Sequence, residues 1–360
     1  MTTVLIMAGG TGGHVFPALA VARVLKGRDC RVVWLGTRRG IEARLVPAAG
    51  IDVEWVRVAG LRGKGPASWM QAPVRLAQAL ADSLRAVRRT RPDVVLGLGG
   101  FVSGPGGLAA RMLGRPLVIH EQNAVAGLTN RILARLAHTV AEAFPGSFGA
   151  SVGAVAIGNP VRHDIEALGA EPARPPHTPR RLLVFGGSQG AAAINRIVPA
   201  ALALLPATER PAVLHQTGRE RRDAVAAAYA ALGVAAEVHE FIEDMSSAYR
   251  WADLAVSRSG ALTVAELAAA GTPALLVPFP AAVDDHQTAN ARYLTSRGAA
   301  LLLSESALTP ERLAAELRSL LGADASSLAA MAEAARRASV PGAAETLADL
   351  CLAVGSGASR

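Results

Sequence analysis

The stretch VLIMAGGTGGHVFPALAVARVL, residues 4–25, decides the fold of this chain. It starts as a short apolar run at 4–7, breaks into the turn GGTGGH at 9–14, and continues as an Ala-, Leu- and Val-rich helical pattern from near Pro17. An apolar strand, a glycine-rich turn and a helix in this order are typical of an anion site, because backbone N–H groups and a helix N-terminus face the ligand. The turn also sets His14, a titratable side chain, beside that anion.

Length and composition indicate a globular protein of two domains. The chain has 360 residues, more than one hydrophobic core usually organises, with 51% hydrophobic and 18% charged residues. Aromatic residues make up only 4%, which weighs against base-stacking nucleic-acid modules. The two cysteines, Cys30 and Cys351, cannot form a disulfide framework and favour a reducing compartment. With no signal-peptide pattern and no apolar run of about 18 residues, we expect a cytosolic or peripheral protein.

The formal net charge of +8 favours acidic partners such as nucleotides, nucleic acid or an anionic lipid surface. Almost all of the 37 basic residues are arginine, and genome composition explains such usage equally well. The charge therefore does not choose among these partners.

Strand-like runs alternate with helical stretches along the whole chain, which predicts α/β domains with parallel sheets covered by helices. Ligands then bind at the carboxyl ends of the strands. The expected strands are 4–7, 31–35, 53–58, 94–98, 117–119 and 155–157, then 182–185, 212–216, 235–239, 254–256, 274–277 and 300–303.

The two series of strands look like copies of one plan. GGTGG at 9–13 and GGSQG at 186–190 each follow the first strand of a series, and a third glycine-rich turn at 99–107 follows the strand 94–98. A Pro-, Ala- and Arg-rich stretch at 169–181 reads as a linker or surface loop. We expect residues 1–162 and 163–341 to form the two domains, and the final helical stretch could pack on either.

The glycine turns leave several interpretations open. A dinucleotide motif begins at Gly10 and Gly12, but Val15 takes its last glycine position and no acid ends the second strand. Arg38 and Arg39 would suit a 2′-phosphate, so an NADP-dependent oxidoreductase remains an alternative. The chain has no P-loop and no Asp-x-Asp, so we expect no dedicated metal-diphosphate clamp. Each turn could also be a tight connection that holds no ligand.

The second half carries two polar motifs. In RSGALTVAE, residues 258–266, Glu266 follows a small-residue turn and is well placed to accept hydrogen bonds from ribose hydroxyls. Its alternative role is that of a helix N-terminal acid stabilised by the helix dipole. DDHQTAN at 284–290 offers donors and acceptors for sugar hydroxyls, or is simply a solvated loop.

Taken in order, seven motifs between about residues 4 and 350 resemble the MurG family: GGTGGHVFPALAVA, GGFVSGPGG, HEQNAVAGLTN, GNPVR, GGSQGA, SRSGALTVAE and DDHQTANA. The resemblance implies the GT-B fold, an α/β architecture of two Rossmann-like, doubly wound parallel-sheet domains facing across a cleft. The helix 343–356 would return to the N-terminal domain, which would face the acceptor and the membrane, and the C-terminal domain would bind UDP-GlcNAc. The implied reaction is the inverting transfer of GlcNAc from UDP-GlcNAc to the 4-hydroxyl of undecaprenyl-diphosphate-MurNAc-pentapeptide, which converts lipid I to lipid II in peptidoglycan synthesis.

The resemblance also implies site residues, motif by motif. Glu266 would bind the ribose, Ile242 the uracil through its backbone, Ser188 the diphosphate and Gln287 the GlcNAc hydroxyls. Arg162 would add positive charge near the diphosphate. The UDP would be surrounded by Ala261, Leu262, Thr263, Val264, Ala265 and Glu266, and the sugar and acceptor would face Thr11, Gly12, Gly13 and Asn123.

For the mechanism, His14 is our candidate for the base that takes the acceptor proton, because the ordinary pKa of histidine near 6.5 suits that task. The alternative is that His14 only shapes the glycine loop. His286 receives no catalytic role, since relatives differ at this position. N–H donors at Ser188 together with Arg162 would stabilise charge on the departing UDP. We expect no required cofactor or bound metal, although Mg²⁺ from solution could help.

A lipid acceptor requires a membrane contact, so we expect a peripheral protein at the cytoplasmic face. Residues 66–91 combine an apolar stripe with arginines, which fits docking on anionic lipid or, equally, a core-facing helix with a solvated basic face. Expected partners are UDP-GlcNAc, lipid I, the anionic membrane surface and other cell-wall synthesis proteins, with no nucleic acid. The nearer functional alternative is another GT-B enzyme that uses a UDP-sugar, a glycolipid synthase or a UDP-GlcNAc epimerase.

Overall fold

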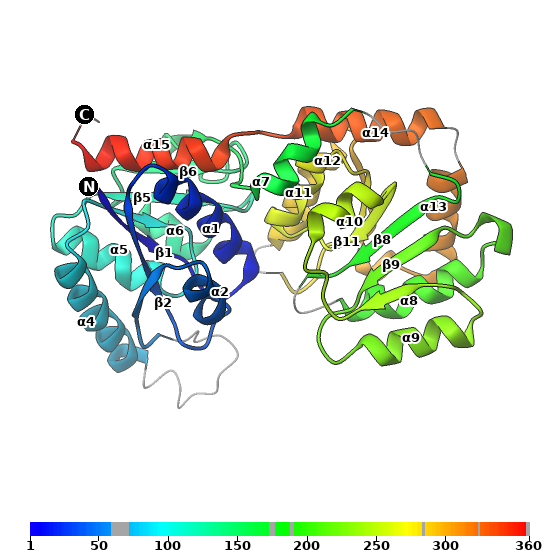
Figure 1. Ribbon diagram of the computed structural model, residues 1–360, viewed down its shortest axis with the longest axis horizontal. Coiled ribbons are helices and arrows are strands. Elements are labelled where there is room, and N and C mark those ends of the chain that lie inside the picture. Colours follow the sequence, from blue (N-terminus) through cyan, green and yellow to red (C-terminus); the bar gives the residue numbers. More distant parts are fainter. Residues whose placement is uncertain (59–71, 173–176, 188–190, 283–284, 323–324, 358–360) are drawn as a thin grey trace. The chain divides into compact units, whose positions relative to one another are not determined.

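The computed structural model describes residues 1–58, 72–172, 177–187, 191–282, 285–322 and 325–357, and contains two fully parallel sheets (Figure 1). The chain divides into two compact units: unit 1 comprises Met1–Arg162 with Gly342–Arg360, and unit 2 comprises His163–Pro341. The expected α/β class with doubly wound parallel sheets is confirmed.

The sheet of unit 1 has seven strands in the order β3-β2-β1-β4-β5-β6-β7. Alternate residues of β1 enter different cores, so that Val4 and Ile6 pack on one face and Leu5 and Met7 on the other. Both faces of a parallel sheet are buried, which is why these strands are apolar throughout. The strand bounds are β1 (Thr3–Met7), β2 (Arg31–Gly36), β3 (Asp52–Trp55), β4 (Val94–Gly97), β5 (Leu117–Glu121), β6 (Thr139–Glu142) and β7 (Val155–Ala156).

Helices cover both faces of this sheet. The first core contains residues of α1 (Gly12–Gly27), α2 (Glu42–Ala48) and α15 (Ala343–Gly355), and the second contains residues of α4 (Ala72–Thr90) and α5 (Ser103–Met112). The short helix α6 (Leu128–Leu133) contacts α5 and β5.

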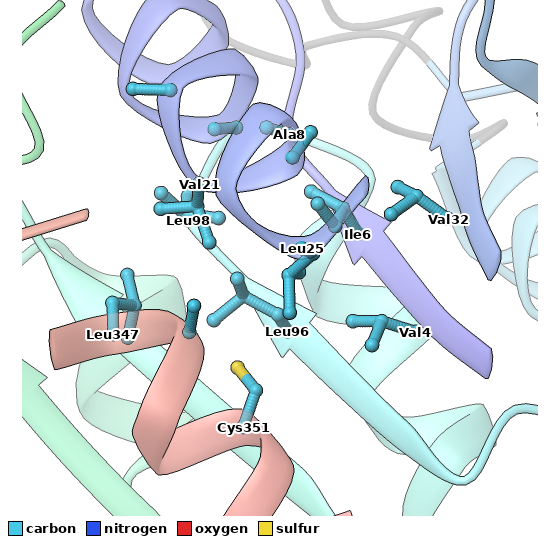
Figure 2. Packing of buried hydrophobic residues seen from close by; sticks show 14 of the residues in the cluster. Val4, Ile6, Ala8, Val21, Leu25, Val32, Leu96, Leu98, Leu347 and Cys351 are labelled. Carbon is cyan, nitrogen blue, oxygen red and sulfur yellow. The ribbon is translucent and has the colours of Figure 1, made fainter. Parts of the chain in front are cut away.

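The last helix of the chain belongs to the core of unit 1. Figure 2 shows Leu347 and Cys351 of α15 pointing toward Leu96 of β4, with Leu25 of α1 and Val4 of β1 close by. Leu347 and Cys351 are completely buried, and burial raises the pKa of the Cys351 thiol well above its ordinary value. The apolar stripe of α15 therefore stabilises unit 1.

The sheet of unit 2 repeats the plan with six strands in the order β10-β9-β8-β11-β12-β13. The strands are β8 (Arg181–Phe185), β9 (Ala212–Gln216), β10 (Glu237–His239), β11 (Leu254–Ser257), β12 (Ala274–Leu276) and β13 (Ala300–Leu302). The α-helices are α7 (His163–Glu166), α8 (Ala192–Ala203), α9 (Arg222–Ala231), α10 (Met245–Trp251), α11 (Ala261–Ala270), α12 (His286–Thr295), α13 (Pro310–Gly322) and α14 (Ala325–Ala338).

In each sheet the strand order reverses beside the first strand. In unit 1 the reversal falls between β1 and β4, and in unit 2 between β8 and β11. Ligands of doubly wound sheets bind outside the carboxyl ends of the strands at such a reversal. The glycine-rich turns after β1 and β4 and the RSGALTVAE motif after β11 all lie at these two places.

All twelve predicted strands occur, with shifts of a few residues at their ends, but the structure adds β6, which we missed. Its sequence TVAE mixes one β-branched residue pair with alanine and glutamate, which favour helix. Helix α1 also begins at Gly12 and not near Pro17, so that the glycines and His14 form its first turn.

Candidate active site

The first glycine turn leads directly into a helix N-terminus. Gly10 has φ +92°, a left-handed conformation that glycine adopts without strain. Thr11 precedes α1 in extended conformation, and its side chain makes no capping hydrogen bond. The first N–H groups of a helix have no partner within it, so an anion can bind them. Thr11 is exposed and Gly12 and Gly13 are half-buried, as a ligand-binding turn requires.

The buried carboxylate of Glu42 stabilises the first glycine turn through hydrogen bonds. Glu42, at the start of α2, is completely buried, and its Oε2 accepts a hydrogen bond from Gly10 N at 3.0 Å. Its Oε1 accepts from Thr37 N at 3.1 Å and from Thr37 Oγ1 at 2.7 Å. A Cβ on Gly9 would approach Glu42 Oε1 to 2.7 Å. Because the N–H of Gly10 donates to Glu42, an anion would bind the backbone N–H groups that follow Gly10.

The turn after β4 packs against the first turn through two glycines with positive φ. Gly99 and Gly100 have φ +98° and +82°. A Cβ on Gly100 would lie 2.3 Å from Gly9 O, and one on Gly99 would lie 2.9 Å from two atoms of the His14 ring. Only glycine permits this approach, so the sequence GG at 99–100 sets the position of the His14 ring.

His14 lies at the end of a buried chain of polar side chains. Its Nδ1 is 2.8 Å from Gln122 Oε1, while Gln122 Nε2 is 3.1 Å from His120 Nδ1. His120 Nε2 lies 2.9 Å from Gly158 O. Gln122 and His120 are almost completely buried, and burial lowers the pKa of His120 to about 4. His14 itself is half-buried at the surface end of this chain.

The adjacent Glu121 shapes the loop that carries Asn123. Its Oε1 accepts from Asn123 N at 2.9 Å and from Asn123 Nδ2 at 3.1 Å. Its Oε2 accepts from Gly127 N at 3.1 Å and from Asn130 Nδ2 at 2.9 Å. The side chain of Asn123, which we expected to face the acceptor, thus also contributes to the internal structure of this loop.

Arg162 places positive charge beside the first helix. Its guanidinium carbon lies 5.5 Å from the centre of the Phe16 ring, and Phe16 in turn lies next to Gly12, where a Cβ would meet the ring at 3.0 Å. A cation and a helix N-terminus on the same side of unit 1 both favour an anionic ligand. Thr11, Gly12, Gly13, His14 and Arg162 are thus grouped around the start of α1.

In unit 2, the RSGALTVAE motif forms the turn before α11 and the first turns of that helix. Gly260 precedes the helix in extended conformation without a side-chain cap. Glu266 is 6% exposed, and its Oε2 accepts a hydrogen bond of 3.0 Å from Tyr249 of α10. Leu262, Thr263 and Ala265 are half-buried, whereas Ala261 and Val264 are buried. Val264 has no exposed surface, and its backbone N–H donates to Gly260 O at 2.9 Å.

Gln287 lies close to the same helix. Its Oε1 accepts from Phe279 N at 2.9 Å, and its backbone oxygen accepts from Ser259 Oγ at 2.8 Å. The amide NH₂ of Gln287 is therefore directed away from Phe279 and can act only as a donor. Ile242 is half-buried in the loop after β10, and no backbone hydrogen bond of Ile242 is recorded within the described ranges. Ser188 and Asp284 lie outside the described residues.

The described residues contain no group of three or more His, Cys, Asp or Glu side chains that could hold a metal ion. Among their helices, none combines the length and the apolar character needed to span a bilayer.

Comparison with known proteins identifies the class. Residues 4–142 match the glycosyltransferase family 28 N-terminal domain, and residues 181–347 match the family 28 C-terminal domain. The calicheamicin glycosyltransferase CalG4 shares the fold, with TM-score 0.70 at 20% identity over 100% of both chains. Together with ligand-type turns at both strand reversals, these matches define a family 28 glycosyltransferase of the GT-B fold.

The relatives within that class are more specific. The crystal structure of Acinetobacter baumannii MurG aligns with TM-score 0.80 and 41% identity, covering 98% of this chain and 99% of that chain. Two relatives are named UDP-N-acetylglucosamine--N-acetylmuramyl-(pentapeptide) pyrophosphoryl-undecaprenol N-acetylglucosamine transferase. The one from Nitrosococcus oceani is 58% identical and covers 98% of this chain and 99% of its own length. The one from Methylococcus capsulatus is 55% identical and covers 97% of this chain and 98% of its own length. The chain belongs to the MurG family.

The structure adds four residues that we did not single out from the sequence: Glu42, His120, Gln122 and Tyr249. His120 and Gln122 carried a signal, because ionisable and amide residues at the end of a buried strand need a specific polar environment. Glu42 reads as an ordinary helix N-terminal acid. Tyr249 lies in α10, whereas Glu266 lies in α11, and nothing in the sequence around Tyr249 indicates a contact with Glu266.

Proposed function

We propose that this protein transfers GlcNAc from UDP-GlcNAc to the 4-hydroxyl of undecaprenyl-diphosphate-MurNAc-pentapeptide, with inversion at the anomeric carbon, and so converts lipid I to lipid II in peptidoglycan synthesis. One observation carries the proposal: relatives named for this reaction are 58% and 55% identical to this chain over nearly its whole length. Loops that could hold a nucleotide sugar and an anionic acceptor, one set in each unit, support it.

Unit 2 is the proposed donor domain. Glu266 would accept hydrogen bonds from the ribose hydroxyls, the backbone of Ile242 would pair with uracil, and Gln287 would donate to GlcNAc hydroxyls. The geometry supports these roles, because Tyr249 holds the buried Glu266 carboxylate and Phe279 directs the Gln287 NH₂ group. The diphosphate would lie at the N-terminus of α11, where N–H groups stabilise its charge. Ser188 keeps its proposed diphosphate role on sequence grounds alone.

Unit 1 is the proposed acceptor domain, with Thr11, Gly12, Gly13 and Asn123 against the sugar and the acceptor. His14 is the proposed general base: the acceptor 4-hydroxyl loses its proton to the ring as its oxygen attacks the anomeric carbon opposite to UDP. Arg162 would stabilise charge near the diphosphate. We propose that the reaction requires no resident cofactor and that a divalent ion, if it helps, comes from solution.

We further propose that unit 1 docks on the anionic cytoplasmic face of the membrane, where other cell-wall synthesis proteins also act. Large apolar side chains are exposed on three neighbouring helices: Val74 and Leu76 on α4, Leu108 and Met112 on α5, and Leu128 and Ile132 on α6. We call these six residues the α4–α6 patch. Exposed arginines on the same helices, such as Arg88 and Arg111, supply attraction to anionic lipid. Trp69 and Met70, which belong to the apolar stripe expected within residues 66–91, lie outside the described residues.

A comparison of donors tests the proposal. We expect transfer from UDP-GlcNAc onto a soluble lipid I analogue to exceed transfer from UDP-Glc and UDP-Gal by orders of magnitude, because Gln287 and its neighbours would read the sugar. Faster transfer from either hexose donor would favour the alternative, another GT-B enzyme such as a glycolipid synthase. Formation of an epimerised UDP-sugar without acceptor would favour the epimerase.

A further inference from the structure

The hydrogen bonds behind His14 determine which of its two ring nitrogens carries a hydrogen. The chain of bonds starts at Gly158 O, which can only accept, so His120 Nε2 at 2.9 Å must donate. His120 is completely buried and burial lowers its pKa to about 4, so near pH 7 its ring is neutral and its Nδ1 is an acceptor.

The orientation of the Gln122 amide follows from two acceptors. Gln122 Nε2 lies 3.1 Å from His120 Nδ1 and 3.0 Å from His120 O. Neither atom can donate, so the NH₂ group must face both of them, and the carbonyl oxygen Oε1 must point the other way. Oε1 is the atom that lies 2.8 Å from His14 Nδ1. Because Oε1 can only accept, Nδ1 of His14 must carry the hydrogen.

A neutral imidazole has one protonated and one unprotonated nitrogen. With the hydrogen on Nδ1, the lone pair of His14 is on Nε2, and within the described part of the chain no hydrogen bond to Nε2 is recorded. On the side of the β4 turn the ring lies close to Gly99, where a Cβ would be 2.9 Å from two ring atoms, so there is little free space on that side. The contacts with Gln122 and Gly99 therefore determine the orientation of the His14 ring, and Gln122 determines which of its nitrogens is protonated.

We propose that Gln122, itself oriented by His120, is a positioning residue that holds neutral His14 with its hydrogen on Nδ1 and so makes Nε2 the atom that takes the acceptor proton. This inference rests on the proposed function of His14 as the general base. In that step the O–H bond of the 4-hydroxyl breaks and an Nε2–H bond forms. The oxygen forms its bond to the anomeric carbon, and the bond from that carbon to UDP breaks with its electron pair on UDP.

This arrangement differs from a histidine held by a carboxylate. Glu121, the carboxylate adjacent to Gln122 in sequence, accepts from Asn123, Gly127 and Asn130. The recorded bonds from His14 to Gly158 pass through amide, imidazole and carbonyl groups alone. A neutral amide fixes the tautomer without adding negative charge behind the ring. The hydrogen bond from His14 to Gln122 therefore mainly determines which ring nitrogen reacts, and it does little to raise the basicity of the ring.

The first test measures the His14 tautomer in the wild-type protein and uses a variant only to assign the signals. In the full-length protein labelled with ¹⁵N-histidine, the His14 signals are assigned by comparison with His14→Ala. We expect a protonated Nδ1 and an unprotonated Nε2 at pH values where the ring is neutral. A hydrogen on Nε2, or a mixture of both forms, would overturn the proposal.

The second test removes the acceptor. Gln122→Met keeps most of the side-chain volume but cannot accept from Nδ1, so we expect a mixture of His14 tautomers and a fall in kcat of about 10- to 100-fold, part of the usual contribution of a general base. The KM for UDP-GlcNAc should not change, because the proposed donor residues lie on other elements.

The matched control is Asn159→Ala, which removes the 3.4 Å bond from Asn159 Nδ2 to the backbone oxygen of Gln122 and leaves the amide of that side chain in place. It should leave the His14 tautomer unchanged. An unaltered tautomer in Gln122→Met would contradict the positioning role. An altered tautomer with unaltered kcat would instead refute His14 as the base, and absence of any transfer by the wild-type protein would refute the proposed function, so the three failures are distinguishable.

Discussion

The phenolic hydroxyl of Tyr249 donates a 3.0 Å hydrogen bond to Oε2 of Glu266, and both side chains are buried. The Tyr249 ring is fixed in turn by Phe185, with centroids 5.9 Å apart and planes at 77°. A residue of α10 thus determines where a carboxylate of α11 presents its oxygens. This hydrogen bond helps to orient the Glu266 carboxylate for the proposed ribose contact.

Replacing Tyr249 by phenylalanine should therefore weaken donor binding. The ring and its contact with Phe185 remain, but Glu266 loses a hydrogen bond to a charged group, so we expect the KM for UDP-GlcNAc to rise on the order of tenfold with little change in kcat. The matched control is Tyr229→Phe, because Tyr229 is equally buried and its hydroxyl bonds to His215 Nδ1 at 2.9 Å. Equal KM values for the two variants would contradict a specific role for Tyr249.

Glu42 offers a test of the first glycine turn. In Glu42→Gln one carboxylate oxygen becomes an NH₂ group that faces donors, either at Gly10 or at Thr37, so we expect the free energy of unfolding to fall by about 1–3 kcal/mol. The KM for a lipid I analogue should rise more than the KM for UDP-GlcNAc. Urea unfolding and steady-state kinetics measure both effects. The control Glu54→Gln removes only the surface pair with Arg89 and should cost less than about 1 kcal/mol.

Mild acid should destabilise the protein through two buried histidines. Burial lowers the pKa of His120 to about 4 and that of His215 to about 3, whereas an unfolded histidine titrates near 6.5. Below pH 6.5 the unfolded state therefore binds more protons than the folded state, and stability falls as the pH falls. At pH 5 the expected loss is on the order of 2 kcal/mol for each histidine.

Two acidic groups with shifted pKa values do not obscure this effect. Hydrogen bonds from Arg57 lower the pKa of Asp82 to about 2, and bonds from Ser247 and Ser246 do the same for Asp244. Both groups are ionised in the folded and the unfolded state between pH 6.5 and 5, so their contributions are lost only in stronger acid. Urea unfolding between these two pH values isolates the histidines, and constant stability over that range would contradict their buried, neutral state.

The C-terminal helix should be essential to unit 1. Leu347 is completely buried against the first core, so Leu347→Ala should lower the free energy of unfolding by about 2–5 kcal/mol. Leu352→Ala, on the same helix but only half-buried, is the matched control and should cost clearly less. Equal and small losses for both variants, measured by denaturant unfolding, would show that α15 does not pack as described.

The structure also determines which arginines can test the membrane contact. Arg85 pairs with the buried Asp82 and Arg89 pairs with Glu54, so altering them would disturb the fold as well as the charge. Arg88 and Arg111 are exposed, and no ion pair of either is recorded in the described ranges. Arg88→Gln/Arg111→Gln should lower binding to anionic vesicles on the order of thirtyfold, since each basic residue contributes about 1 kcal/mol.

The control for that experiment carries the same change of charge on the other face of the sheet. Arg23 of α1 and Arg44 of α2 are exposed, and these two helices pack on the core opposite to α4 and α5. Arg23→Gln/Arg44→Gln should bind vesicles like the wild-type protein. Equal losses in both double variants would show that only net charge matters and that the α4–α6 patch has no special role.

The strands and glycine turns could be predicted from the sequence because their signals are local. The apolar run before GGTGGH and the repeat of that plan at GGSQG need no knowledge of distant residues. The support of the site could not be predicted in this way. Glu42 reaches Gly10 across 32 residues of sequence, and Gln122 reaches His14 across 108, so these partners become visible only when the sheet brings their loops together.

Turnover by His14→Ala is the most direct measurement of whether His14 acts as the base. This variant should lose about 10²–10⁴-fold in kcat for GlcNAc transfer to a lipid I analogue while it keeps the wild-type affinity for UDP, measured by calorimetry. Near-wild-type turnover, or a parallel loss of UDP affinity, would contradict the assignment of His14 as the base.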